Sequence, residues 1–432
     1  MLSRRAEAVA SVALAAIGFT IVTGETLPVG LIADVARGVH ATTTQVGLVI
    51  TWYACVTAAV AVPLTRWSAR FDRRSVLFGC AGMFGLGHIV TACATNLGVL
   101  LAGRAMAALS HGVYFAIATP AILRVARPES RARAGGRIAV GVTSALVVGT
   151  PLATLLGQNA GWRAAVLALA AFSLALAIAV GRLLPPLPAQ HRDQPRSAAG
   201  VSAALRAPGL RTVFAVTLGL VCGHFCLFTY VAPFAGHRLG LHGSAFTMLL
   251  LAYGASAVAC SVVGGRLVEV GPVRTVRVLA VLLGLDLLAL FVAGLLRSPL
   301  LGVPLVLAWS GLFSALGVST GLAVLRCADG PSMETANALY NIVFQSGIVG
   351  GSALGSAIFS TGHLGTLPLV AGTGVGLTAL LLLSPAGRVF ATGLPPRGDR
   401  HRTPARPGGA LRRESVTRPD PHPQVREVEA RS

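Results

Sequence analysis

The sequence predicts an all-α integral membrane protein with twelve transmembrane helices in two pseudo-symmetric halves of six. Three observations lead to this fold class. The chain is 54% hydrophobic and only 12% charged, with a mean hydropathy of +0.73, whereas soluble domains are typically about 45–50% apolar and about 25% charged. Twelve apolar runs are long enough to cross a hydrocarbon core of about 30 Å. A polar segment divides these runs into two sets of six.

The apolar runs are predicted to be helices, because a spanning segment must satisfy its own backbone hydrogen bonds. A β-barrel would show short alternating segments instead, and a large soluble bundle would need polar faces that these runs lack. The start MLSRR imitates a secretory signal, but eleven further runs favour an uncleaved first helix. The predicted spans are 9–32, 43–65, 75–95, 97–123, 138–157, 163–184, 212–235, 245–268, 276–296, 299–322, 336–360 and 365–384.

The net charge of +20 comes from arginine, since the chain has 35 arginines and no lysine. With the N-terminus inside, thirty arginines fall in cytoplasmic segments and one, Arg104, lies within a helix. The outer loops and helix edges hold only Arg37, Arg163, Arg238 and Arg297. The positive-inside rule therefore predicts cytoplasmic N- and C-termini. The charge thus indicates membrane orientation and not nucleic-acid binding. The preference for arginine over lysine, with many Ala, Gly, Val and Leu residues, suggests a GC-rich bacterial genome, and we expect a multi-pass protein of the bacterial inner membrane.

Four segments organise the chain. We predict an N-terminal six-helix half at 1–184, a cytoplasmic linker at 185–210, a C-terminal six-helix half at 211–384 and a disordered basic tail at 385–432. The linker is rich in proline, arginine and glutamine, and the tail lacks apolar periodicity. The tail arginines either rest on anionic lipid or are solvated.

The two halves carry related loops after their second helices. TRWSARFDRR (65–74) and GRLVEVGPVR (265–274) are offset by 200 residues, and two six-helix halves about a pseudo-two-fold axis are a transporter architecture. The second loop resembles the motif G-x-L-x-D-x-x-G-R-R of the major facilitator superfamily. The first copy departs from it, with Thr65 for the glycine and Ala69 for the acid. The matching residues are Arg70, Arg73 and Arg74 in the first copy and Gly265, Glu269 and Arg274 in the second.

Two further segments carry the resemblance. LLAGRAMAALSHG resembles the superfamily's helix-4 arginine motif through Arg104, and GVTSALVVGTPLATLLGQNAGWR resembles the glycine–proline motif of drug-efflux members. With TGETLPVGLI and TWYACVTAAVAVPLT, they resemble the sugar-efflux and chloramphenicol-resistance branch of drug–proton antiporters, over about residues 8–385. In the fifth helix the resemblance implies a gate between the halves, whereas plain helix packing is the alternative. The residues concerned are Gly141, Gly149, Pro151 and Gly157.

Glu25 is an ionisable side chain at bilayer depth, about seven residues or ~10 Å below the predicted outer end of helix 1. A charge there costs from ~2.5 to more than 10 kcal/mol unless it is paired, neutralised or hydrated. Arg104 lies at a similar depth in helix 4, and the resemblance implies that the two helices are neighbours. We predict that Glu25 is a coupling carboxylate and that its proton affinity changes with its hydration or its distance from Arg104. The alternative is a static ion pair that fixes helix register.

Other polar side chains in the spans are candidates for proton relay or substrate contact. His111 lies two turns from Arg104 and either relays protons or packs. The resemblance places helices 3 and 9, which carry His88 and Asp286, outside the central cavity. Small-molecule pockets are mostly apolar with a few polar groups, although interfacial or packing roles remain open. The predicted substrate-binding residues are Tyr53, Tyr114, His224, Tyr230, Trp309, Tyr340, Asn341 and Gln345.

The function predicted from these features is proton-coupled export of small, largely apolar molecules such as drugs or sugars, by rocking of the two halves. A proton-coupled metabolite importer is the alternative within transport, and a membrane-embedded sensor is a weaker one. An enzyme would need a metal cluster or a nucleophile with a base, and Cys222 and Cys226 fit packing better than a metal site. We therefore expect no enzyme activity and no cofactor besides the proton gradient. The expected partners are the bilayer, the substrate and protons, with the chain a monomer.

Overall fold

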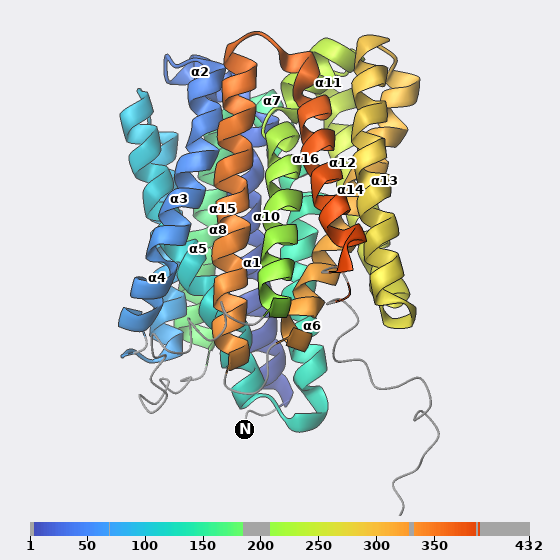
Figure 1. Cartoon of the computed structure of the whole chain (residues 1–432). Helices are drawn as coiled ribbons and strands as arrows, with labels where there is room; N and C mark the ends of the chain where they lie inside the picture. Colours follow the sequence, from blue (N-terminus) through green and yellow to red (C-terminus); the bar gives the residue numbers. More distant parts are fainter. Residues whose placement is uncertain (1–3, 69, 185–207, 328–331, 386–387, 389–432) are drawn as a thin grey trace, which may run out of the picture. The chain divides into compact units, whose positions relative to one another are not determined.

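Twelve helices in the described part of the chain are long and apolar enough to span a membrane, which confirms the predicted fold class and helix number. The computed structural model describes residues 4–68, 70–184, 208–327, 332–385 and 388, all within one compact unit, Met1–Gly393 (Figure 1). No strand occurs among these residues. The predicted linker and tail fall almost wholly outside them, although α10 already begins at Pro208.

The first six spans contain ten helical elements among the described residues, because a π-helical turn divides the fifth span and two short helical elements lie in the loops. The elements are α1 (Arg4–Gly30), α2 (Ile32–Gly38), α3 (Thr43–Ser68), α4 (Arg73–Ala92), α5 (Leu97–Val125), the 3₁₀ turn η1 (Pro128–Ser130), α6 (Arg131–Ser144), the π-helix η2 (Ala145–Gly149), α7 (Thr150–Ala160) and α8 (Trp162–Leu183).

The last six spans also have a short helix after the first span, but their fifth span is one continuous helix and a 3₁₀ turn precedes the last span. The elements are α10 (Pro208–Phe228), α11 (Val231–Leu239), α12 (Gly243–Val270), α13 (Pro272–Leu295), α14 (Pro299–Cys327), α15 (Ser332–Ser360), the 3₁₀ turn η3 (Leu364–Thr366) and α16 (Leu367–Leu383).

Helices 1 and 7 end earlier than predicted, because each breaks and restarts as a short helix. The breaks fall at Leu31 (φ −125°, ψ 19°) and Tyr230 (φ −115°, ψ 22°). An uninterrupted apolar pattern cannot reveal such a break, so the predicted spans 9–32 and 212–235 ran through it. Leu31 and Tyr230 are 199 residues apart, close to the offset of 200 between the two loop motifs. The matching breaks support a repeat between the halves.

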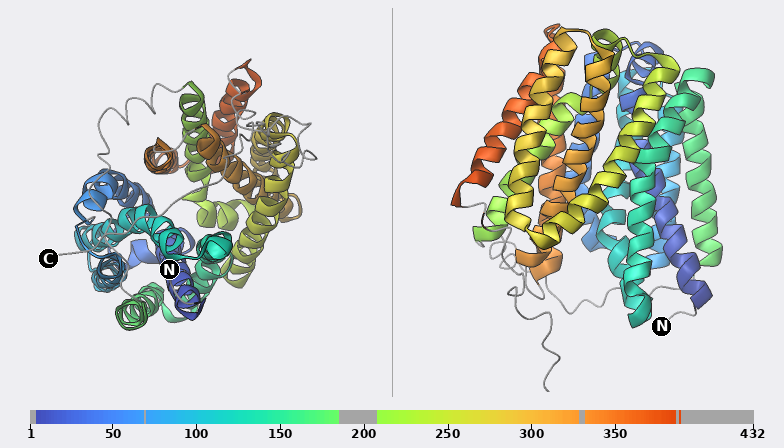
Figure 2. Two further views of the ribbon diagram at one scale, coloured as in Figure 1. Left: turned by 90° about the horizontal axis from the view of Figure 1, so that it is seen from below. Right: turned by 90° about the vertical axis from the view of Figure 1, so that its right-hand side faces the viewer.

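The halves meet along two pairs of spans, α3 with α15, and η2 and α7 with α12. Figure 1 shows α3 beside α15, and the view from below in Figure 2 shows the blue-to-teal helices of the first half on one side and the green-to-red helices of the second half on the other. Thr51 and Ser352 share a hydrogen bond of 2.7 Å across the first seam. Thr247 donates to the Gln158 side chain at 3.0 Å across the second. Both bonds lie toward the end of the bundle that carries α2 and α11, called the upper end here.

Candidate functional site

Arg104 binds the backbone of α1 at a point where a proline has removed a hydrogen bond. Pro28 has no N–H, so the carbonyl of Gly24, four residues earlier, loses its helical donor. Arg104 Nη1 donates to that carbonyl at 2.6 Å, and Nη2 donates to the carbonyl of Glu25 at 3.2 Å. A neighbouring side chain thus satisfies the backbone group that the proline left unpaired, as membrane helices require.

Glu25 does meet the side chains predicted with it, but in a different arrangement from the expected ion pair. Arg104 contacts the Glu25 carbonyl, and no ion pair within 4 Å joins their side chains in the described chain. His111 lies beside the carboxylate instead, with 3.8 Å between Nδ1 and Oε2. The Tyr53 hydroxyl and His111 Nδ1 share a hydrogen bond of 3.2 Å. The static ion pair considered as the alternative is therefore absent from this arrangement.

The Glu25 side chain is nearly enclosed, with 13% of its surface exposed. The guanidinium of Arg104 lies 4.4 Å above the centre of the Tyr53 ring, which places its charge against the π face. Tyr53 is itself buried. The four side chains form one cluster, called here the polar cluster: Glu25 on α1, Tyr53 on α3, and Arg104 and His111 on α5. It is the one cluster of the described chain that brings three predicted proton-coupling residues together.

The second half has an aromatic counterpart to this cluster. Tyr253 on α12 follows Tyr53 by 200 residues, and it packs edge-on against Trp309 of α14 with ring centres 5.4 Å apart. His224 on α10 follows Gly24 by the same 200 residues. In the first half the guanidinium of Arg104 lies over the ring of Tyr53, whereas in the second half the indole of Trp309 packs against the ring of Tyr253. The repeat thus holds a charged site in one half and an uncharged aromatic site in the other.

His224 lies at the centre of the aromatic site. Its ring stacks on Phe313 with centres 3.6 Å apart, and on Phe228 with centres 5.1 Å apart. Trp309 lies 5.1 Å away. Neither His224 Nδ1 nor Trp309 Nε1 has a hydrogen-bond partner among the described residues, although both atoms are buried. We call these four residues and Tyr253 the aromatic cluster. Sequence reasoning missed Tyr253, although the 200-residue offset from Tyr53 pointed to it.

Several predicted substrate residues hold helices together. Tyr114 donates to the carbonyl of Leu14 at 2.7 Å and is fully buried. Tyr340 shares a hydrogen bond of 3.0 Å with Thr320. Asn341 is half-buried, and Gln345 is buried.

Tyr230 lies where the second half meets α3, with its hydroxyl 3.5 Å from the carbonyl of Thr44. Within the second half its hydroxyl donates to Ser356 at 2.8 Å, and its ring stacks on Phe359. Burial raises the pKa of Tyr230 to about 12, so the hydroxyl keeps its proton and can donate. This contact joins the break before α11 to α15 and fits a helix-seam role.

The first-half loop motif is built around an aspartate that the motif comparison did not include. Asp72 caps α4 by accepting from the backbone amides of Arg74 at 3.0 Å and Ser75 at 2.9 Å. The Arg74 guanidinium donates to the carbonyl of Gly181 at the end of α8. Arg73 is buried, whereas Arg70 is exposed. Capping and helix tethering are the contacts that the structure assigns to this loop.

The second-half copy is less enclosed. Gly265 is half-buried on α12 and Arg274 is exposed near the start of α13. The side chain of Glu269 lies outside the described part of the chain.

The glycines of the fifth span face the first helix. A Cβ added at Gly141 would meet the backbone of Ala15, one at Gly149 the hydroxyl of Thr23, and one at Gly157 the side chain of Leu31. Pro151 is buried between them. These glycines therefore allow close helix packing within the first half, which was the alternative to a gate between the halves. The seam with the second half runs through η2.

Gly254 of α12 packs directly on the backbone of η2 across that seam, and Gly254→Ala should separate the two helices. The added Cβ would lie 2.5 Å from both Leu146 O and Val147 Cα, backbone atoms that cannot rotate away. We expect a loss of about 1–3 kcal/mol of stability, as in other overpacked sites, measured as a lower unfolding temperature of the purified protein. Gly265→Ala on the same helix is the control, because its Cβ would meet only Val318 at 3.9 Å. Equal effects at the two positions would contradict the close contact.

Comparison with known proteins places these features in a family context. The family model described as Major Facilitator Superfamily matches residues 14–352. A probable sugar efflux transporter of Mannheimia succiniciproducens is 30% identical over 84% of this chain and 90% of its own. A chloramphenicol efflux pump of Mycobacterium tuberculosis is 32% identical over 80% of this chain and 84% of its own.

Solved structures share the fold at lower sequence identity. Two crystal structures of a bacterial homologue of the human lysosomal transporter Spinster, inward-facing and either unoccupied or occupied, superpose with TM-scores of 0.66 and 0.70. Each is 17% identical, and each alignment covers 90% of this chain and 97% of the other. This likeness concerns the fold alone.

Proposed function

The chain belongs to the Major Facilitator Superfamily, and we propose that it is a proton-coupled antiporter that exports small, largely apolar molecules. Its relatives named as a probable sugar efflux transporter and a chloramphenicol efflux pump support export. The proposed mechanism is alternating access by rocking of the two halves about the seams between them. The proposed location is the inner membrane of a bacterium, with a monomer as the working unit and the proton gradient as the energy source.

The observation that carries this proposal is the polar cluster. The Glu25 carboxylate is nearly enclosed in the membrane-spanning region, and the nearest cation, Arg104, is engaged with backbone carbonyls instead of the carboxylate. A carboxylate without a fixed ion pair at this depth is stabilised by binding a proton. His111, 3.8 Å away, is the group through which the proton can be exchanged. Hydration of the cluster in one conformation and its closure in the other would couple protonation to the motion.

The arginine distribution supports a cytoplasmic lower end, where the N-terminus lies in Figure 1. The hydrogen bonds between the halves, Thr51 with Ser352 and Thr247 with Gln158, lie toward the opposite end. In this orientation, both of these hydrogen bonds between the halves lie toward the outer side of the membrane. An exporter whose halves meet on that side takes up its substrate from the cytoplasm.

The aromatic cluster is the proposed surface for apolar substrate groups, and Phe313→Ala is its test. We expect this variant to raise the KM for a substrate with an aromatic ring by roughly 2–10-fold, because an aromatic pair contributes about 0.5–1.5 kcal/mol. Concentration dependence of transport measures it. Phe78→Ala is the control, since Phe78 is 48% exposed on α4. An unchanged KM for Phe313→Ala, or an equal rise for Phe78→Ala, would contradict the assignment.

Transport into inverted membrane vesicles tests the whole proposal. An imposed gradient, acidic inside, should drive accumulation of labelled compounds from a panel that includes chloramphenicol and simple sugars. Dissipating the gradient with a protonophore should stop it. Accumulation in right-side-out vesicles, driven by an inward proton gradient, would instead establish the importer. Accumulation that is independent of pH would exclude proton coupling.

A further inference from the structure

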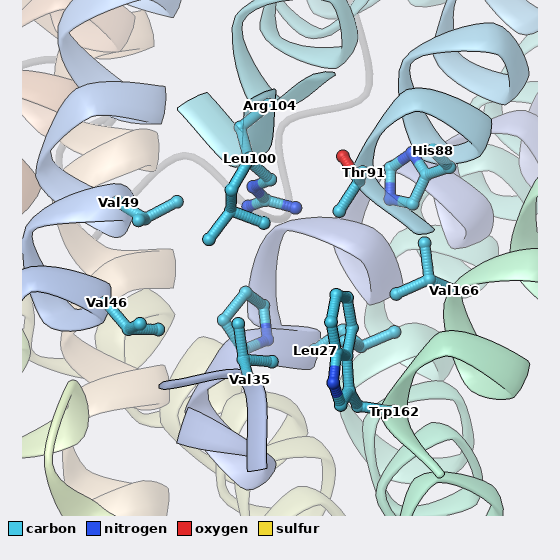
Figure 3. Close-up of a pocket in the computed structure, with 11 residues that line it drawn as sticks. Leu27, Val35, Val46, Val49, His88, Thr91, Leu100, Arg104, Trp162 and Val166 are labelled. Carbon is cyan, nitrogen blue, oxygen red and sulfur yellow. The ribbon is translucent and has the colours of Figure 1, made fainter. Parts of the chain in front are cut away.

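A small cavity lies beside the polar cluster, among residues of α1, α2, α3, α4, α5 and α8, and Arg104 of the cluster lines it. It has a volume of about 20 Å³, and eleven residues line it (Figure 3). Most of the lining is apolar, but His88, Thr91 and Arg104 contribute polar groups. Figure 3 shows the Arg104 and His88 side chains on either side of Thr91. A space of this size accommodates one water molecule, which needs ~10–15 Å³, and excludes any transported organic compound.

Two nitrogen atoms at this cavity lack partners among the described residues. His88 is 1% exposed, and its Nδ1 is 2.9 Å from the carbonyl of Phe84. Because a carbonyl accepts, Nδ1 carries the hydrogen and Nε2 is left as an acceptor. Arg104 is 2% exposed and uses both terminal nitrogens on α1, which leaves its Nε–H as a donor. His88 Nε2 and Arg104 Nε are both buried and unpaired in the described chain.

The histidine ring and the guanidinium meet at the same peptide of α1. A Cβ placed on Gly24 would lie 2.7 Å from His88 Nε2, so the ring packs directly on that residue. The carbonyl of Gly24 is the acceptor of Arg104 Nη1. One side chain from α4 and one from α5 therefore converge on the residue that precedes Glu25.

We propose that the cavity binds one water molecule, which accepts from Arg104 Nε–H and donates to His88 Nε2. Such a water satisfies both buried groups and gives the water two polar partners, within the usual two to four. His88 is then a positioning residue: through the water it holds the guanidinium plane against the carbonyls of Gly24 and Glu25. This inference extends the proposed function, because it names the group that keeps Arg104 on the backbone while Glu25 exchanges its proton.

Thermal unfolding of the purified full chain tests the water link without any transport assay. His88→Leu should lower the unfolding temperature by about 2–4 °C, and His88→Gln, which retains an acceptor, should restore most of this loss. In an Arg104→Lys background, which lacks the Nε donor, His88→Leu should have less than half its effect. His363→Leu, at an exposed histidine of the upper end, is the control and should change nothing. Equal effects of His88→Leu in the two backgrounds would overturn the inference.

A spectroscopic measurement keeps the inference testable where a variant fails to fold. In wild-type protein labelled with ¹⁵N-histidine, His88 should show a protonated Nδ1 and an Nε2 that accepts a hydrogen bond. An Nε2 resonance typical of an unbonded ring nitrogen would overturn the inference.

Transport separates this inference from the proposed function. If the wild type shows the Nε2 signature but no proton-driven transport, the water link holds and the proposed function fails. If it shows proton-driven transport and an unbonded Nε2, the reverse follows.

Discussion

Glu25→Gln is expected to abolish proton-driven export while leaving the protein folded. Glutamine has nearly the size and shape of the glutamate, so its contacts with His111 and the enclosed site persist, but it cannot bind and release a proton. Accumulation in inverted vesicles under a pH gradient should fall by more than about tenfold, since one pKa unit of coupling corresponds to about 1.4 kcal/mol. Exchange of labelled for unlabelled substrate at equal pH should continue, because it needs the motion but no net proton transfer.

Glu129→Gln is the matched control for this substitution. Glu129 is an exposed acid in the turn η1, so its replacement should leave gradient-driven accumulation unchanged. Full export by Glu25→Gln would remove Glu25 from the coupling mechanism. Loss of both driven export and equal-pH exchange would indicate a damaged fold or site instead of lost coupling.

Arg104→Met should cost both stability and transport. Methionine fills much of the same volume but leaves the Gly24 carbonyl, already deprived of a helical donor by Pro28, without a partner. An unsatisfied buried carbonyl costs about 1–3 kcal/mol, and the loss of the guanidinium over Tyr53 adds to it. The unfolding temperature of the purified protein and the rate of gradient-driven transport measure the two effects.

A second substitution tests the physical reason for this loss. Pro28→Ala restores a backbone N–H that can donate to the Gly24 carbonyl within α1. The double variant Arg104→Met with Pro28→Ala should therefore recover part of the stability that Arg104→Met loses. The absence of any recovery would show that the backbone contact is not what Arg104 stabilises.

The residues of the polar cluster illustrate how far sequence reasoning reached. An acid and an arginine at similar depths predicted that Glu25 and Arg104 would meet, and they do, but through the Glu25 carbonyl. Counting four residues back from Pro28 would have identified the Gly24 carbonyl as a group in need of a donor. His111 was placed on the right helix, yet its contact with Glu25 depends on side-chain orientation, which helical spacing alone does not determine.

His88 shows a different limit. Its helix was expected to lie outside the central cavity, and no partner for the His88 ring was predicted. In the structure the long side chains of Phe84 and His88 reach from α4 to Gly24 of α1, where the glycine has no side chain to exclude them. A contact that a glycine permits because it has no side chain is difficult to predict from the sequence.

By itself the sequence determined that this is a membrane protein and how many transmembrane spans it has. The reason is that each apolar residue exposed to water, and each unpaired backbone group exposed to lipid, has its own free-energy cost. The sequence also identified the ionisable residues within the spans, which need a partner, a proton or water in the membrane. Only the tertiary structure decided which atoms those residues meet, where helices 1 and 7 break, and that the two repeats hold an ionisable cluster in one half and an aromatic one in the other. These outcomes depend on distances between helices, which arise from packing among segments far apart in the chain.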